Sequence, residues 1–255
     1  MLRLHGVAML AVACALRAGI ICAQDVSSST AAIAAGDTNT TRTGEPASVI
    51  PVPKGLKLHE TFLKRAKEGP IDVLFLGDSI TQRWATSGTL VWQKHYGDLK
   101  PANFGIGGDR TQHILWRIAH GELDGISPRV LVLLIGTNNS NTDEAPDIVA
   151  GVTRIVEQIK VKLPKTKLLL LGIFPRAAQR DLPANVPNQR VAAANKELAK
   201  FDNGKSIRYL DISKKLAKDG TMPPNVSVDG VHLTEKGYEI WAEAMNPLLQ
   251  EMLKQ

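Results

Sequence analysis

Residues 71–81 of this 255-residue chain read IDVLFLGDSIT, an apolar run that stops at a glycine and an Asp-Ser pair. A short apolar run bounded by turn residues is typical of a strand that is buried on both faces, as in a parallel sheet. Gly77 permits a tight turn, and Ser79 then stands at the start of the next segment. Ligands of open α/β sheets bind beyond the carboxyl ends of the strands. The stretch therefore predicts a buried strand that presents a serine at the edge of a sheet.

Similar apolar runs recur along the chain and alternate with segments of helical periodicity. The predicted strands are 71–76, 130–135 and 168–173, with weaker runs at 102–104 and 207–210. The predicted helices are 58–67, 111–119, 145–163, 188–201 and 234–253. This alternation predicts an α/β fold: a three-layer α/β/α domain around a parallel sheet of about five strands.

The N-terminal residues have the pattern of a secretory signal. Arg3 precedes a short apolar run at 7–16, and both cysteines of the chain, Cys14 and Cys22, fall within residues 1–23. We therefore expect a signal peptide over 1–23 and a secreted or periplasmic protein. Its removal leaves no cysteine, which excludes disulfides, thiolate catalysis and Cys-ligated zinc from the mature chain. The apolar run is also too short to span a bilayer, so we expect no stable membrane insertion after signal removal.

Composition separates a linker from one globular domain. Residues 24–54 are rich in Ser, Thr, Ala, Gly and Pro and lack hydrophobic periodicity, which predicts a flexible linker. The remaining residues, 55–255, are expected to form the catalytic domain. Hydrophobic residues make up 44% of the chain and charged residues 22%, which is normal for a protein that buries a core. The formal net charge of +6 is spread without a basic block, so nucleic-acid binding is not expected.

Two further strand ends, and a loop near the C-terminus that precedes the last predicted helix, carry groups that suit chemistry on an ester. Residues 103–111 read NFGIGGDRT, and their glycine N–H groups could face an anion. No Gly-Lys-Ser/Thr follows, so a phosphate loop is not favoured. Residues 136–139 read GTNN and supply amide donors, and residues 229–232 read DGVH and supply a carboxylate next to an imidazole.

Each of these motifs has an ordinary structural explanation when it is taken alone. Ser79 suits a helix cap, Asn138 suits a turn, and Asp229 with His232 suits a surface loop. Together, at one edge of one sheet, they supply a nucleophile, hydrogen-bond donors and an acid–base pair. This combination is what acyl transfer requires.

With these four blocks in this order, the sequence resembles the SGNH, or GDSL-type, esterases and lipases from about residue 56 to the C-terminus. Ile80 stands where the name-giving Leu is usual. Within the family, residues 103–117 and 121–123 look most like the catalytic subunits of intracellular platelet-activating-factor acetylhydrolase. The resemblance implies a flavodoxin-like SGNH hydrolase fold and a serine esterase that needs no cofactor and no metal.

The resemblance also implies a role for each site residue. Ser79 is the expected nucleophile, His232 the general base and then acid, and Asp229 the carboxylate that orients the imidazole. The N–H groups of Ser79 and Gly108 and the side chain of Asn138 are the expected oxyanion hole. The choice of Gly108 over the neighbouring Gly107 stays open.

The expected function is the hydrolysis of short-chain, mainly acetyl, esters, with carbohydrate esters as one substrate class. Predicted export favours this substrate, and residues 176–187 are polar and offer no apolar lid for a long acyl chain. The alternatives are an acetylhydrolase or lysophospholipase acting on phospholipid esters, and a non-catalytic carbohydrate-binding relative. A homodimer is left open.

Three histidines and one arginine outside the four blocks are further candidates for a site. His59, His95 and His120 have no carboxylate or histidine at metal-ligand spacing, so no metal site is expected. Arg176, which follows the fourth predicted strand, suits either a contact with a substrate anion or a structural ion pair.

Overall fold

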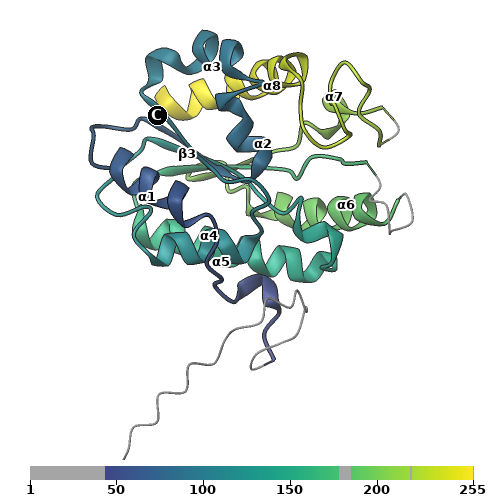
Figure 1. Ribbon diagram of the computed structural model, residues 1–255, viewed down its shortest axis with the longest axis horizontal. Coiled ribbons are helices and arrows are strands. Elements are labelled where there is room, and N and C mark those ends of the chain that lie inside the picture. The colour runs from purple at the N-terminus through teal and green to yellow at the C-terminus, as the bar shows by residue number, and fades with distance from the viewer. Residues whose placement is uncertain (1–43, 178–184, 219, 255) are drawn as a thin grey trace, which may run out of the picture. The chain divides into compact units, whose positions relative to one another are not determined.

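The computed structural model describes residues 44–177, 185–218 and 220–254. The predicted signal peptide over 1–23 and most of the predicted linker over 24–54 lie outside these residues. The described chain contains a five-stranded sheet whose strand order is β2-β1-β3-β4-β5 and whose neighbouring strands are all parallel (Figure 1). The strands are β1 (Val73–Gly77), β2 (Pro101–Gly105), β3 (Val130–Leu134), β4 (Lys167–Leu171) and β5 (Ile207–Leu210). The predicted fold class is confirmed.

Helices cover both faces of the sheet and give the domain three layers (Figure 1). One face packs against α1 (Leu56–Arg65), α4 (Thr111–Ala119), α5 (Ala145–Lys162) and α6 (Val186–Leu198). The other face packs against α2 (Ser79–Gln82), α3 (Thr89–Tyr96), α7 (Ser213–Leu216) and α8 (Glu235–Lys254). Short 3₁₀ turns are η1 (Ala47–Val49), η2 (Arg83–Ala85), η3 (Gly97–Leu99), η4 (Asn139–Asn141) and η5 (Ala199–Phe201). No helix in the described part of the chain is long and apolar enough to cross a membrane.

The strand β1, which lies between β2 and β3, shows why a strand inside this sheet is apolar at every position. Val73 and Phe75 point into the core under α3 and α8, while Leu74 and Leu76 point into the core over α4 and α5. All four side chains are fully buried. A strand between two helical layers has no solvated face, so the two-residue alternation of a half-exposed strand is absent.

Among the described helices that the periodicity did not predict, which are α2, α3 and α7, the longest is α3. Its eight residues, TLVWQKHY, include β-branched and aromatic side chains of modest helix propensity. Only Val91 and Tyr96 are buried, so the segment has no continuous apolar stripe. Packing against α8, rather than local preference, accounts for this helix.

Residues 44–54 lie against the domain, although the sequence predicted a flexible linker up to residue 54. Ser48 is buried, and its carbonyl oxygen accepts a hydrogen bond from the Thr111 hydroxyl at 2.8 Å. The Val52 N–H donates to the Gln112 carbonyl oxygen at 3.2 Å. Because these contacts use backbone groups and small residues, they leave no hydrophobic periodicity in the sequence. The packed chain therefore begins before residue 55.

Candidate active site

Ser79 stands where β1 turns into α2, at the carboxyl edge of the sheet. A Cβ on Gly77 would collide with the Leu134 carbonyl oxygen, so the turn requires glycine there. The Asp78 carboxylate caps α2 by accepting a hydrogen bond from the Ile80 N–H at 2.9 Å. Asp78 is thus the helix cap, and Ser79, the first residue of α2, is left half-buried with its hydroxyl available.

Ser79, His232 and Asp229 form one hydrogen-bonded chain. The Ser79 Oγ atom lies 2.9 Å from the His232 Nε2 atom, and the His232 Nδ1 atom lies 2.6 Å from an Asp229 Oδ2 atom. Because a carboxylate only accepts hydrogen bonds, the neutral imidazole that fits this arrangement carries its proton on Nδ1. Its Nε2 lone pair then faces the serine hydroxyl.

The loop around Asp229 holds its carboxylate beneath the imidazole. The other carboxylate oxygen, Oδ1, accepts hydrogen bonds from the backbone N–H groups of Val231 at 2.9 Å and His232 at 2.7 Å. Gly230 between them has a φ of +76°, in the left-handed region that favours glycine. Desolvation raises the pKa of Asp229, but the hydrogen bonds from the His232 ring and from these backbone groups outweigh it and hold the pKa at about 2. The carboxylate is therefore ionised throughout the neutral range.

The groups predicted to form the oxyanion hole keep N–H donors that the described part of the chain does not use. The N–H of Ser79 begins α2 and has no partner within the helix. Among the described residues, neither this N–H nor that of Gly108 has a hydrogen-bond acceptor. The glycine loop runs beside the serine: a Cβ atom placed on Gly107 would lie 4.0 Å from the Ser79 Cβ atom. The Asn138 side chain donates one N–H to the Asp109 carbonyl oxygen at 2.9 Å and keeps a second N–H for a ligand.

The two adjacent asparagines point to different places. Asn139 is buried, and its amide oxygen accepts a hydrogen bond from the Thr111 N–H at 3.0 Å. Its amide nitrogen donates to the Asp143 carboxylate at 2.7 Å. Asn139 thus fixes the start of α4, whereas Asn138 faces the glycine loop.

Sequence reasoning missed a contact from the N-terminal segment to this loop. The Lys54 Nζ atom donates a hydrogen bond to the Gly108 carbonyl oxygen at 2.5 Å. Gly108 has a φ of +71°, and a Cβ there would lie 2.6 Å from the same Nζ atom. Lys54 lies in the predicted linker, and no motif in the sequence marks it.

Two buried carboxyl groups flank the site. The pKa of Asp78 is raised to about 7, chiefly by burial and also by the charge of Asp109, while the Ile80 N–H and Arg176 oppose the rise. Burial raises the pKa of Asp109 to about 6, against the opposing effect of the Arg117 guanidinium. A carboxyl group that is out of water loses the solvation of its charged form, so protonation becomes easier.

Arg176 is held by neutral groups of the protein: among the described residues no carboxylate lies within ion-pair distance of its guanidinium, so the expected structural ion pair is not formed. Its side chain is buried, and its Nη1 atom donates to the Thr137 carbonyl oxygen at 2.8 Å. Burial lowers the pKa of Arg176, while the charges of Asp78 and Asp229 oppose that effect. Asn188 fixes the Arg176 backbone by accepting from its N–H and donating to its carbonyl oxygen.

The histidines considered for metal binding have other partners. The His59 Nδ1 atom lies 3.2 Å from a Glu122 carboxylate oxygen, which is 63 positions away in sequence. His95 contacts Glu239 and Asn246. In the described ranges, no group of three or more His, Cys, Asp or Glu side chains is arranged to hold a metal ion.

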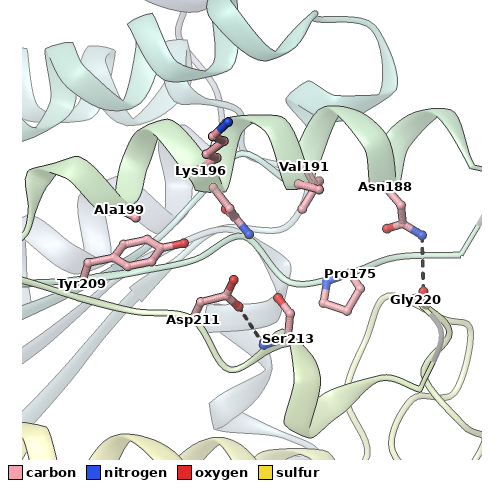
Figure 2. A pocket seen from close by; sticks show the side chains of 11 residues that line it. Pro175, Asn188, Val191, Lys196, Ala199, Tyr209, Asp211, Ser213 and Gly220 are labelled. Atoms are coloured by element: carbon pink, nitrogen blue, oxygen red, sulfur yellow. Dashed lines mark hydrogen bonds between the residues drawn. The ribbon is translucent and has the colours of Figure 1, made fainter.

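A separate pocket of about 530 Å³ lies at the carboxyl ends of β4 and β5, between α6 and α7 (Figure 2). Figure 2 shows Asn188 bonded to Gly220 across its mouth and Asp211 bonded to Ser213 at its base. None of the predicted site residues lines this pocket. The hydrogen-bonded chain at Ser79, and not this pocket, is therefore the candidate active site.

Known proteins with similar sequences cover the part of the chain that contains this site. A model of the GDSL-like lipase/acylhydrolase family matches residues 75–240, a range that contains every predicted site residue. The chain is 34% identical over 199 residues to the alpha2 subunit of platelet-activating factor acetylhydrolase IB from Rattus norvegicus. That alignment covers 77% of this chain and 84% of the rat protein.

Solved structures show the same fold. A GDSL-like lipase from Bacteroides thetaiotaomicron superposes with a TM-score of 0.63 at 18% identity, covering 76% of this chain and 97% of that one. A carbohydrate acetylesterase from Sinorhizobium meliloti superposes with a TM-score of 0.55 at 16% identity, covering 71% of this chain and 99% of that one. At these identities the likeness concerns the fold.

Proposed function

The chain belongs to the GDSL-like lipase/acylhydrolase family and is a carboxylic ester hydrolase, and we propose that Ser79 is its nucleophile. The observation that carries this proposal is the chain of hydrogen bonds from Asp229 through His232 to the Ser79 hydroxyl, at 2.6 and 2.9 Å. A serine hydroxyl is a weak nucleophile unless a base takes its proton, and His232 is in position to do so.

In the proposed first half-reaction, the Ser79 Oγ atom attacks the carbonyl carbon of the ester while its proton moves to the His232 Nε2 atom. The negative charge that develops on the carbonyl oxygen is stabilised by the N–H groups of Ser79 and Gly108 and by the Asn138 amide. The ionised Asp229 stabilises the imidazolium. His232 then gives its proton to the leaving alcohol, and an acyl-serine remains.

In the second half-reaction, a water molecule gives a proton to the His232 Nε2 atom and attacks the acyl carbon. Collapse of the tetrahedral intermediate releases the carboxylic acid and returns the proton to Ser79. Each step uses only side chains and backbone N–H groups of this chain together with one water molecule, so the proposed mechanism needs no metal ion. Hydrolysis that a chelator abolishes and zinc restores would contradict this mechanism.

We propose the acetyl group as the acyl part of the substrate. The name of the rat relative describes an acetylhydrolase, and that of the Sinorhizobium meliloti protein describes an acetylesterase. Residues 176–187 are polar in sequence and offer no apolar lid that could cover a long acyl chain, which supports a short acyl group. Rates of p-nitrophenyl ester hydrolysis from acetate to laurate test this choice. A higher kcat/KM on laurate than on acetate would refute it.

For the alcohol part we propose a carbohydrate, because the N-terminal pattern predicts export of the protein. The second candidate is an acetylated phospholipid, which the 34% identity to a platelet-activating factor acetylhydrolase subunit favours. Acetate release from acetylated sugars and from acetylated phospholipids, measured side by side, separates the two. N-terminal sequencing of the exported chain, expressed at full length, tests the signal peptide. A mature chain that begins at Met1 would refute it.

A further inference from the structure

A cluster of buried charges lies directly behind the glycine loop. Arg117, on α4, has no exposed surface, and neither do Asp109 and Glu122. The Arg117 Nη2 atom donates to an Asp109 carboxylate oxygen at 2.9 Å, and the Nη1 atom donates to the Phe104 carbonyl oxygen at 3.2 Å. Nη1 also donates to the Glu122 carboxylate, whose other oxygen lies 3.2 Å from the His59 ring.

The partners of Arg117 bracket the loop that carries the proposed oxyanion donor. Phe104 precedes residues 105–108, and Asp109 follows them. One guanidinium group therefore holds both ends of the loop. Its planar fork of donors suits this task, because two partners are reached in a fixed relative geometry.

Asp109 also connects the loop to the second proposed donor. Its carbonyl oxygen accepts the hydrogen bond from the Asn138 amide at 2.9 Å, and its carboxylate is the one that Arg117 holds. Gly108 is its immediate neighbour in the chain. A shift of Asp109 would therefore move both Gly108 and Asn138 away from the carbonyl oxygen of the substrate, which we propose that they bind together.

We infer that Arg117 is a positioning residue for the oxyanion hole: by holding Phe104 and Asp109, it fixes Gly108 and Asn138 relative to Ser79. This inference rests on the proposed function of that site. Arg117 does not touch the substrate; it acts through Asp109. Donors must stand at hydrogen-bond distance from the oxyanion, and a displacement of about 1 Å is enough to cost about a hundredfold in rate.

A purely structural role would give a different result, because an ion-pair network that only stabilises the fold affects the amount of folded protein and not the rate of each folded molecule. Arg117→Lys keeps the charge but loses the fork. We expect kcat on p-nitrophenyl acetate to fall by about tenfold or more, with KM changed by no more than about twofold. Binding of a trifluoromethyl ketone, which forms a tetrahedral adduct, should weaken in parallel.

The matched control is Ile159→Ala. Ile159 is buried in the core near the C-terminal end of α5, which runs back to the amino edge of the sheet, away from the loop. This variant should lower the melting temperature while kcat of the folded protein stays unchanged. If Arg117→Lys fails to fold, Asp109→Ala replaces it, since this change leaves Arg117 paired with Glu122. The same loss of kcat at constant KM is expected.

A double-mutant cycle with Asn138→Ala tests the route of the effect. If Arg117 acts through the oxyanion donors, the fold-loss of kcat in the double variant should be smaller than the product of the two single fold-losses, by a factor of about ten. Losses that multiply, or a folded Arg117→Lys protein with wild-type kcat, would overturn the inference alone. An inactive wild-type protein would overturn the proposed function, and this inference with it.

Discussion

The Nε2 atom of His232 lies 2.9 Å from the Oγ atom of Ser79, although 153 positions separate the two residues in the sequence. Ser79 follows β1, whereas His232 belongs to the loop that leads into α8. The fold brings the two together because α8 packs over the same sheet face as α2. The chemistry proposed for this protein depends on that contact.

The first prediction concerns the pH dependence of ester hydrolysis. His232 can take the serine proton only while Nε2 is unprotonated, so kcat/KM should fall as acid is added. Because the pKa of Asp229 is held at about 2, that carboxylate stays charged over the same range and adds no second step. A pH–rate profile from pH 5 to 9 measures this. A flat profile would argue against histidine as the base.

The second prediction separates the two adjacent asparagines. Asn138→Ala should lower kcat by about 10²–10³-fold with little change in KM, because it removes one oxyanion donor. Asn139→Ala should instead destabilise the fold by about 1–3 kcal/mol, because buried partners such as the Thr111 N–H lose their hydrogen bonds. Its kcat should stay close to that of the wild type. Kinetics and urea unfolding of both variants decide the point, and the opposite pattern would mean that the other asparagine is the donor.

The third prediction concerns the backbone of the glycine loop. Gly108→Ala should lower kcat by about tenfold or more, because a left-handed backbone costs an L-residue about 1–2 kcal/mol and the loop would shift. The new Cβ would also approach the Lys54 Nζ atom to 2.6 Å. Lys54→Met relieves that second contact but not the backbone strain. The double variant should therefore remain slower than Lys54→Met alone, and equal rates would show that crowding by Lys54 was the whole effect.

The fourth prediction concerns stability and pH at the buried cap. The pKa of Asp78 rises from an ordinary 3.8 to about 7 on folding, so between these values the folded state binds a proton that the unfolded state lacks. The free energy of unfolding should therefore fall as the pH rises through this range. Asp109, with a pKa of about 6, acts in the same direction.

The variant Asp78→Asn tests how much of this pH dependence of stability is due to Asp78. The amide oxygen still accepts from the Ile80 N–H, but no charge has to be buried. The decline of the urea midpoint between about pH 4 and 7 should become shallower in this variant. A decline identical to that of the wild type would assign the effect to other groups.

The sequence predicted the sheet and the site motifs for the same physical reason. Strands buried on both faces must be apolar throughout, as Val73 and Leu74 are, so they contrast with the polar residues at their ends. Parallel strands then bring those ends to one edge. The positions of Ser79 and Asn138 at that edge follow from this topology, whereas His232 is brought there by the loop that leads into α8.

Contacts that depend on packing left no such signal. Arg117 and Glu122 read as polar helix and turn residues in the sequence, yet both are fully buried because they pair with each other and with Asp109. Lys54 reaches the glycine loop from a segment without periodicity. Such contacts form because segments of the chain pack against one another in the fold. The spacing of residues along the sequence does not reveal which segments will do so.

Labelling with a fluorophosphonate tests the central claim most directly. The reagent forms a stable bond with an activated serine, and peptide mapping by mass spectrometry locates it. We expect one label per protein molecule, on Ser79, with esterase activity lost in proportion, and no label on folded Ser79→Ala. Full loss of activity with Ser79 unmodified, or turnover by Ser79→Ala at the wild-type rate, would contradict it.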